Sequence, residues 1–262
     1  MYKPFDLSAK TVLVTGGNRG IGFGMAKALA EAGATVVIWG SSAENNARAL
    51  ELLRPISDNV FAQQVNIGIE DDVVNGMAET LSHTGRLDAA FANAGIGSGS
   101  MGVMPFIQQP TEGFQDMIEV NLKGSFRTLR EAAKHMVARA KAGDPGGSLV
   151  GFTTVGTARG MAYLEPYTAT KSAMEGMIRA ISMELGRYGI RANTIQPGFI
   201  QTDMTARMRE NEDLAKDIVG KVPARRWGNP DDFGGIAVYL ASDASKYHSG
   251  DIMVVDGGYL TQ

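Results

Sequence analysis

The chain contains no cysteine, only three histidines, no long apolar run and little net charge, and each absence excludes a class of protein. Without thiols it can form neither disulfides nor thiolate metal sites. The histidines His83, His135 and His248 stand far apart and lack carboxylates at ligand spacing. We therefore expect no metal site and no metal-dependent reaction.

The charge pattern does not favour binding to polyanionic partners. The formal net charge is −3, and basic and acidic residues are interspersed, so we predict no binding to nucleic acid. No apolar run approaches bilayer thickness, and the first residues lack an apolar signal region. We therefore expect no membrane association and a cytoplasmic location. With 262 residues and 44% hydrophobic content, the chain can build one substantial core, which predicts one domain.

Apolar runs of strand length alternate with longer amphipathic segments, a pattern typical of repeated βα units around a parallel sheet. The runs predict strands at 11–15, 35–39, 60–65, 88–92, 147–153, 190–195 and 252–255. Helices are expected at about 20–32, 42–54, 70–82, 111–141, 166–187, 203–220 and 230–241. The glycine-rich stretch 95–102 follows a strand's carboxyl end, where open α/β sheets bind their ligands.

A glycine-rich turn follows the first strand. Residues 16–22 read Gly-Gly-Asn-Arg-Gly-Ile-Gly and lead into an alanine-rich helix. Glycines let the backbone approach a pyrophosphate, whose charge is stabilised by free N–H groups and the helix dipole. The spacing Gly-x3-Gly-x-Gly differs from the common G-x-G-x-x-G, and a plain tight turn is the alternative. The order strand, turn and helix favours cofactor binding.

Tyr167 and Lys171 lie four residues apart at the start of an expected helix, so the phenol and the ammonium share one face. A nearby positive charge favours phenolate, and a phenol that exchanges protons at neutral pH needs its pKa lowered by roughly 3 units from about 10. The pair predicts a proton-transfer centre. Taken alone, it also fits a half-buried tyrosine beside a solvated lysine.

Several motifs occur in a fixed order: Thr15-Gly16-x3-Gly20-x-Gly22, Asn93-Ala94-Gly95, Asn121, Tyr167-x3-Lys171 and Pro197-Gly198. In order and spacing they resemble the short-chain dehydrogenase/reductase family, in its shorter single-domain branch. The resemblance implies a three-layer, doubly wound Rossmann fold, with a parallel seven-stranded sheet and helices on both faces. It also implies one NAD(P)-binding domain over residues 1–262, with a lid at about 199–222. Enoyl reductases are similar but space the tyrosine and lysine more widely.

The resemblance implies an NAD(P)-dependent oxidoreductase that interconverts a secondary alcohol and a ketone by hydride transfer. Tyr167 would be the acid or base, and Lys171 would favour phenolate and hold the nicotinamide ribose. Asn121 resembles the family's asparagine that helps to hold a water chain. Two alternatives remain open: a cofactor-binding regulatory or scaffold protein with little turnover, and a dehydratase or isomerase using the same site.

One catalytic position departs from the family pattern. The serine expected thirteen residues before the tyrosine is here Thr154, which keeps a hydroxyl but adds a β-methyl group that restricts χ1. We expect Thr154 to fill the serine's role. The adjacent Thr153 should face the opposite side, because strand side chains alternate.

The cofactor site implied by the resemblance is built mainly from turns and strand ends. It comprises Gly16, Asn18, Arg19, Gly20, Ile21, Gly22, Ser41, Ser42, Asn66, Ile67, Asn93, Ala94, Gly95, Tyr167, Lys171, Pro197, Gly198, Ile200 and Thr202. Asn66 would accept a hydrogen bond from the adenine amine.

Cofactor choice depends on the end of the second strand. An acidic residue there would bind the ribose diol and repel a 2′-phosphate, but the aligned position is Gly40, followed by Ser41. Glu44 we interpret as part of a capping box with Ser41. Arg19 resembles the basic residue that pairs with the 2′-phosphate. These features favour NADP(H), with NAD(H) as the alternative.

The substrate and the assembly are also inferred. A pocket between Thr154, Tyr167 and the lid could include the apolar residues Met104, Phe106, Met161, Tyr163, Leu164, Phe199, Met204 and Met208. We predict an apolar or cyclic alcohol or ketone. The helices expected at 111–141 and 166–187 resemble the family's dimer face, so a homotetramer is expected.

Overall fold

A computed structural model of the chain describes residues 3–98 and 102–261, and its seven strands form one parallel sheet of order β3-β2-β1-β4-β5-β6-β7. The strands are β1 (Thr11–Thr15), β2 (Thr35–Gly40), β3 (Val60–Gln64), β4 (Ala89–Ala92), β5 (Gly147–Phe152), β6 (Ile190–Pro197) and β7 (Ile252–Val255). Strand order reverses between β1 and β4, where doubly wound sheets bind ligands. The predicted fold class is confirmed.

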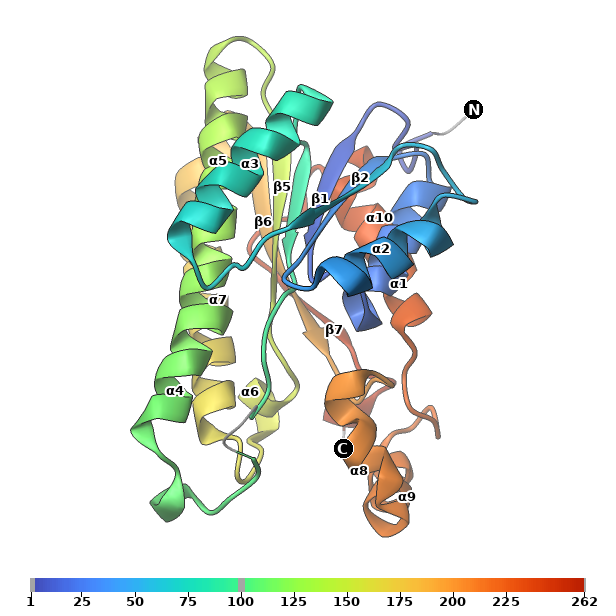
Figure 1. Ribbon diagram of the computed structural model, residues 1–262, viewed down its shortest axis with the longest axis vertical. Helices are drawn as coiled ribbons and strands as arrows, with labels where there is room; N and C mark the ends of the chain where they lie inside the picture. Colours follow the sequence, from blue (N-terminus) through green and yellow to red (C-terminus); the bar gives the residue numbers. More distant parts are fainter. Residues whose placement is uncertain (1–2, 99–101, 262) are drawn as a thin grey trace.

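Helices cover both faces of the sheet (Figure 1). On one face lie α1 (Gly20–Glu31), α2 (Ala43–Leu53) and α10 (Gly234–Ala241); on the other lie α3 (Glu70–Thr84), α5 (Ser125–Lys141) and α7 (Glu165–Leu185). The central strands are apolar along their length because both faces are covered. Met25 and Leu29 of α1 belong to one buried cluster, and Met136 of α5 and Met174 of α7 belong to the other.

The helix expected at 111–141 is interrupted. It consists of α4 (Thr111–Met117), a π-helical turn at Ile118–Gly124, and α5. The wider turn contains Asn121, whose side chain bonds both backbone groups of Ile96 in the loop after β4. π-helical turns frequently occur at functional sites. Helical periodicity could not distinguish this turn from the regular helix on either side.

The prediction of a single helix at 203–220 is also wrong. A 3₁₀ turn at Asp203–Thr205 is followed by α8 (Ala206–Glu210) and α9 (Glu212–Lys221). The break occurs at Asn211, which has an extended backbone and whose side chain accepts a hydrogen bond from the Leu214 N–H. Asparagine favours this capping role over a helix interior. The predicted helix at 230–241 similarly begins with a 3₁₀ turn at Pro230–Phe233, before α10.

The capping prediction at the start of α2 was off by one residue. Ser42, rather than Ser41, is the N-cap, and its hydroxyl accepts a hydrogen bond from the Asn45 N–H at 3.3 Å. Ser41 instead presents its carbonyl oxygen to Gln64 Nε2 at 3.1 Å. Ser41 therefore has a side chain free of the capping role.

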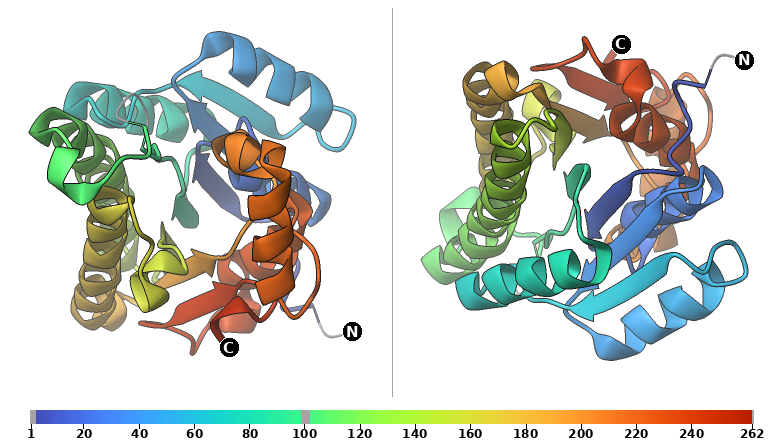
Figure 2. Two further views of the ribbon diagram at one scale, coloured as in Figure 1. Left: turned by 90° about the horizontal axis from the view of Figure 1, so that it is seen from below. Right: turned by 90° about the horizontal axis from the view of Figure 1, so that it is seen from above.

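The carboxyl ends of the strands meet at the lower edge in Figure 1, near α4, α8, α9 and the short helix α6 (Gly156–Arg159). Figure 2, left, looks onto this edge. Of the glycine-rich stretch 95–102, residues 99–101 lie outside the described part. Among the described residues, no helix combines the length and apolar character that a membrane crossing requires.

Candidate active site

The turn between β1 and α1 leaves a helix N-terminus open. Gly16 and Gly20 have φ of +65° and +52°, a conformation that glycine adopts readily. Arg19 occupies the N-cap position without a side-chain cap, and no acidic residue lies in the first turn of α1. The first N–H groups and the positive end of the helix dipole are therefore available to an anion.

The loop after β4 is bonded to this glycine turn. Asn93 Nδ2 donates to the Thr15 carbonyl at 3.0 Å, and the Ala94 N–H donates to Thr15 Oγ1 at 3.0 Å. A Cβ on Gly22 would overlap the Gly16 carbonyl oxygen and lie 2.6 Å from Asn93 Nδ2. These contacts place the two predicted cofactor segments side by side at the switch point of the sheet.

Tyr167 and Lys171 lie on one face of α7, as predicted. Lys171 Nζ lies 5.8 Å from the centroid of the Tyr167 ring, and the lysine side chain is buried, with 4% of the residue exposed. Pro166 is in the first turn of α7, where a missing N–H costs no helical hydrogen bond. No hydrogen bond leaves Lys171 Nζ within the described part of the chain, so this donor is available to a ligand.

Burial dominates the titration of this pair. It raises the pKa of Tyr167 from 10.0 to about 12 and lowers the pKa of Lys171 from 10.5 to about 8. The expected lowering of the Tyr167 pKa by the ammonium is not found, and burial raises this pKa instead. At pH 7 the phenol is neutral, the form that can donate a proton to a carbonyl oxygen.

Asn121 joins the π-helical turn to the loop after β4. Its Oδ1 accepts from the Ile96 N–H at 2.7 Å, and its Nδ2 donates to the Ile96 carbonyl at 2.9 Å. A Cβ on Gly95 would lie 3.0 Å from Asn121 Oδ1 and 3.5 Å from Lys171 Nζ. The asparagine and the lysine thus converge beside Gly95.

Thr154 is the second residue after β5 and is buried, with 9% of the residue exposed. Its Oγ1 lies 3.4 Å from the Gly156 N–H, which donates to it. Thr153 points elsewhere, as strand alternation predicted, and its hydroxyl donates to Glu175 Oε1 at 2.9 Å. The hydroxyl of Thr154 retains its own proton for donation to a substrate.

Two residues that the sequence did not single out hold the Thr154 loop in place. Glu175 Oε1 accepts hydrogen bonds from the hydroxyls of Thr153 and Thr157 at 2.9 and 2.6 Å. Gln196 Nε2 donates to the Thr154 carbonyl at 2.9 Å. One signal was present: Glu175 is four residues after Lys171, which places it on the same helical face as the reactive pair.

The adenosine end of the predicted site contains no carboxylate at position 40. Asn18 Nδ2 donates to Asn46 Oδ1 at 2.8 Å, close to Gly40. The Gly68 N–H donates to Asn66 Oδ1 at 3.0 Å, which leaves that oxygen a second acceptor position. The Ile67 side chain is buried, so only its backbone could reach a cofactor.

The segment after β6 passes over the glycine turn. The Val155 N–H donates to the Pro197 carbonyl at 3.1 Å, and the Gly198 N–H donates to the Val255 carbonyl at 3.0 Å. Ile200 forms a bridge with Gly228. Thr202 lies over the turn, since a Cβ on Gly20 would be 3.2 Å from Thr202 Cγ2.

Arg19 points toward this segment. Its Nη1 lies 3.5 Å from Asp203 Oδ2, and both side chains are largely exposed. Exposed ion pairs of this kind contribute little to stability. Arg19 can therefore leave Asp203 at small cost to pair with a phosphate group.

Two of the predicted apolar pocket residues lie beside the loops that follow β4 and β5. A Cβ on Gly156 would meet Met161 Sδ at 2.9 Å, and one on Gly97 would meet Met204 Cγ at 3.4 Å. Phe199 packs edge-on against Trp227 and Tyr259 and lines a separate groove of about 260 Å³. Phe106 is largely exposed.

The residues present fit a dinucleotide. The open N-terminus of α1 suits a pyrophosphate, and the unbonded Lys171 amine suits a ribose hydroxyl. Tyr167 and Thr154 supply two hydroxyls at the carboxyl edge, where a reacting oxygen could be bound. The larger groove of about 500 Å³ lies apart from these groups, on the outer surface of α5 and α7.

Comparisons with known proteins agree with this geometry. The family model described as Enoyl-(Acyl carrier protein) reductase matches residues 16–260. The chain is 35% identical over 267 residues to the 2-dehydro-3-deoxy-D-gluconate 5-dehydrogenase of Pseudoalteromonas atlantica, covering 99% of each chain. It is 31% identical over 254 residues to the gluconate 5-dehydrogenase of Gluconobacter oxydans, covering 97% of this chain and 96% of the relative.

A solved structure shows the same fold. The gluconate 5-dehydrogenase from Burkholderia cenocepacia, in complex with NADP and tartrate, matches with a TM-score of 0.91 and 29% identity. The match covers 99% of this chain and 98% of that chain.

Proposed function

Since the chain belongs to the short-chain dehydrogenase/reductase family, we propose that it interconverts a secondary alcohol and a ketone by hydride exchange with NADP(H). The observation that supports the proposal is the approach of Lys171 and Asn121 to Gly95, with Tyr167 on the same face of α7 as Lys171 and an uncapped helix N-terminus at the adjoining glycine turn. NAD(H) remains the alternative cofactor.

In this proposal the chain's own residues position the substrate and move the proton. The bound cofactor supplies or accepts the hydride. When a ketone is reduced, Tyr167 donates its phenolic proton to the carbonyl oxygen, and it removes that proton again in the oxidation direction. Thr154 donates a hydrogen bond to the same oxygen, which stabilises the charge that develops there.

Lys171 and Asn121 have supporting roles in this mechanism. The Lys171 amine would hold the nicotinamide ribose, and its charge would favour the phenolate. Asn121 would keep the loop at Ile96 in place and, as in the family, help to hold a water chain. The remaining predicted cofactor residues would line the path from the glycine turn to Thr202.

The preference for NADP(H) follows from the charges at the end of β2. Position 40 carries no side chain, so no carboxylate at this position repels a 2′-phosphate. Arg19 and the hydroxyls of Ser41 and Ser42 are the groups we assign to that phosphate. The relative from Burkholderia cenocepacia was crystallised with NADP.

For the substrate we propose a small polyhydroxy acid or its keto form, because the similar enzymes are named for gluconate derivatives. The predicted apolar or cyclic alcohol or ketone is the second candidate, and Met161 and Met204 beside the site favour it. An enoyl thioester is disfavoured, since the tyrosine and lysine stand only four residues apart.

We also propose that the chain acts as one domain with a lid at about 199–222, and that it works as a cytoplasmic homotetramer. The groove on the outer surface of α5 and α7 supports assembly through those helices. Its lining includes Phe126, Leu129 and Ile181.

The test is a spectrophotometric screen of sugar acids, cyclic ketones and enoyl thioesters with NADPH and NADH. Tyr167→Phe is expected to lower kcat/KM by about 10³-fold while cofactor affinity is retained, because only the proton donor is lost. Full activity in this variant would refute the mechanism. Cofactor binding without turnover on any substrate would favour a regulatory or scaffold protein, and product formation without net cofactor use would favour a dehydratase or isomerase.

Thr154 is tested in the same screen. Thr154→Ser, which restores the family's usual residue, is expected to keep kcat within about threefold. Thr154→Val keeps the shape but removes the hydroxyl, and we expect a loss of about 10²-fold in kcat. Equal activity of the two variants would mean that the hydroxyl takes no part in catalysis.

A further inference from the structure

The side chain of Asn46 is fully engaged at the ends of β2 and β3. Asn46 lies in α2 and only 5% of the residue is exposed. Its Nδ2 donates to the carbonyl oxygens of Gly40 and Gln63, both at 3.0 Å. Because an amide nitrogen carries two protons and both partners are acceptors, the orientation of the amide is determined. Asn46 Oδ1 must therefore be the atom that faces the glycine turn.

This oxygen holds Asn18. Asn18 Nδ2 donates to Asn46 Oδ1 at 2.8 Å, and this is the one hydrogen bond that the Asn18 side chain makes with the described residues. The side-chain oxygen Oδ1 of Asn18 and the second N–H of its Nδ2 are left for a ligand. Asn46 thus sets where the amide of Asn18 stands.

The two amides fill the space beside Gly40. A Cβ at position 40 would overlap Asn18 Nδ2 and Asn46 Oδ1, and it would lie 2.8 Å from Asn18 Cγ. The backbone at Gly40 does not have a positive φ, so its conformation alone would admit other residues. Space, rather than backbone strain, excludes a side chain here.

We propose that Asn46 determines cofactor specificity: by holding Asn18 against Gly40, it excludes a carboxylate from the ribose site and favours NADP(H). The inference rests on the proposed function and adds a residue from α2 to it. A carboxylate at the end of β2 would bind the ribose hydroxyls of NAD(H) and repel a 2′-phosphate. Here a neutral amide pair occupies that volume, and Asn18 keeps one donor and one acceptor for the ribose.

The test combines Gly40→Asp with Asn46→Ala in the full-length chain. Dissociation constants for NADPH and NADH are measured by nucleotide fluorescence, and Tm is measured in parallel. Gly40→Asp alone is expected to weaken binding of both nucleotides by tenfold or more and to lower Tm, since the new side chain collides with Asn18. In the double variant Asn18 is free to turn away, so NADH should bind at least tenfold more tightly than to Gly40→Asp alone, and the preference should reverse.

A neighbouring asparagine provides the matched control. Asn45 contacts Ser42 through its backbone N–H, so Asn45→Ala should leave the behaviour of Gly40→Asp unchanged. Asn18→Ala combined with Gly40→Asp tests the same steric argument if Asn46→Ala does not fold. An identical ratio of the two dissociation constants in Gly40→Asp and in the double variant would overturn the inference alone. Failure of the parent chain to bind either nucleotide would overturn the proposed function as well.

Discussion

Lys171 is a buried amine. The proposed reaction uses its positive charge, but burial in the fold disfavours that charge. Its pKa is lowered by burial from 10.5 to about 8, so at pH 7 the folded protein still carries the charge and bears the desolvation penalty. Unfolded chains bind that proton more tightly. The resulting penalty is fully present below pH 8 and is relieved as the pH rises from about 8 to 10.5.

We therefore predict opposite effects of Lys171→Met on activity and stability. Ketone reduction should fall by about 100-fold or more, because the ribose contact and the charge are lost, while Tm at pH 7 should rise by a few degrees. In the parent chain, kcat/KM for reduction should decline above pH 8 as the amine loses its proton. Steady-state kinetics from pH 6 to 10 and thermal melts check both effects; a lowered Tm in Lys171→Met would contradict the buried-charge argument.

Individual site residues differed in how well the sequence alone predicted their roles. Tyr167, Lys171 and Asn121 were recognisable because their spacing and order are set by the elements that carry them. Asn46 was not, because an asparagine near a helix start looks like a surface or capping residue until its partners are known. Its contacts with Gly40 and Gln63 join three elements, and no local pattern encodes such a meeting.

The helix α7 joins the reactive pair to the Thr154 loop. Tyr167, Lys171 and Glu175 recur every four residues on one face, and Glu175 accepts hydrogen bonds from Thr153 and Thr157 on either side of Thr154. This link fixes the loop relative to the helix that carries the phenol. Glu175 is therefore a positioning residue.

We predict that Glu175→Leu lowers kcat by 10- to 100-fold with little change in the KM for NADPH, because small displacements of reacting groups are costly. Glu175→Gln keeps an acceptor oxygen and should retain activity within about threefold. The measurement is the separation of kcat from KM in the three proteins, with Tm as a check on folding. A parallel rise in the KM for NADPH, or no rescue by glutamine, would indicate a general structural effect instead.

At the level of elements, all seven strands were predictable because buried parallel strands form apolar runs bounded by turns. The errors occurred where local contacts interrupt a periodic pattern. The π-helical turn at Ile118–Gly124 and the break at Asn211 both lie within segments with helical periodicity. Each contains an asparagine whose side chain bonds a backbone group: Asn121 bonds Ile96 in the loop after β4, and Asn211 bonds Leu214 in the first turn of α9.

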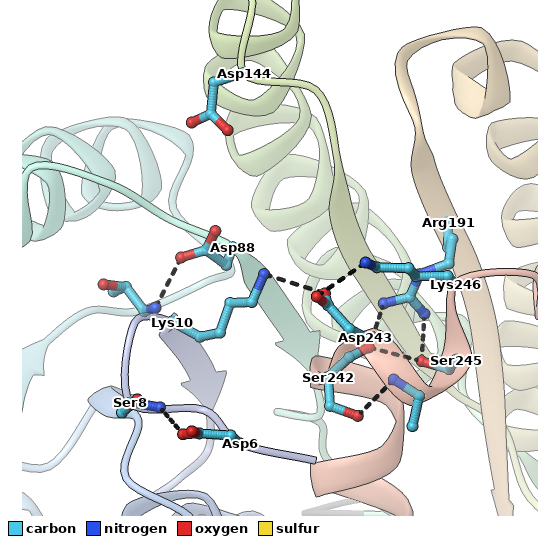
Figure 3. A network of polar contacts seen from close by, with 12 residues as sticks. Asp6, Ser8, Lys10, Asp88, Asp144, Arg191, Ser242, Asp243, Ser245 and Lys246 are labelled. Carbon is cyan, nitrogen blue, oxygen red and sulfur yellow. Dashed lines mark hydrogen bonds and ion pairs between the residues drawn. The ribbon is translucent and has the colours of Figure 1, made fainter. Parts of the chain in front are cut away.

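The two edges of the sheet have different functions in the whole molecule. The carboxyl edge carries the candidate active site, and the amino edge is held by charged groups from distant parts of the chain (Figure 3). There Lys10 and Lys246 lie 3.4 and 3.0 Å from Asp243, and Arg191 donates to Ser245 Oγ at 2.8 Å. Asp88 accepts a hydrogen bond from the Thr11 N–H at 2.9 Å. Changes at this edge should therefore alter stability without altering catalysis.

His135 makes the amino edge sensitive to pH. Its Nε2 accepts a hydrogen bond from the Leu87 N–H at 3.1 Å, which requires the neutral ring, and burial followed by the charge of Arg139 lowers its pKa below 6.5. The unfolded chain takes up this proton near pH 6.5, before the folded protein does. Stability from His135 is thus present above pH 6.5 and is lost as the pH falls below it.

We predict that the free energy of unfolding falls as the pH drops below 6.5, and that His135→Gln removes the His135-dependent component of this fall. Glutamine can present an acceptor oxygen to the Leu87 N–H but does not titrate. Urea unfolding at several pH values measures the slope, and His83→Gln, at an exposed histidine, should leave it unchanged. Because His135 lies at the edge opposite the active site, kcat should be unaffected; an unchanged slope in His135→Gln would show that other groups dominate acid sensitivity in this range.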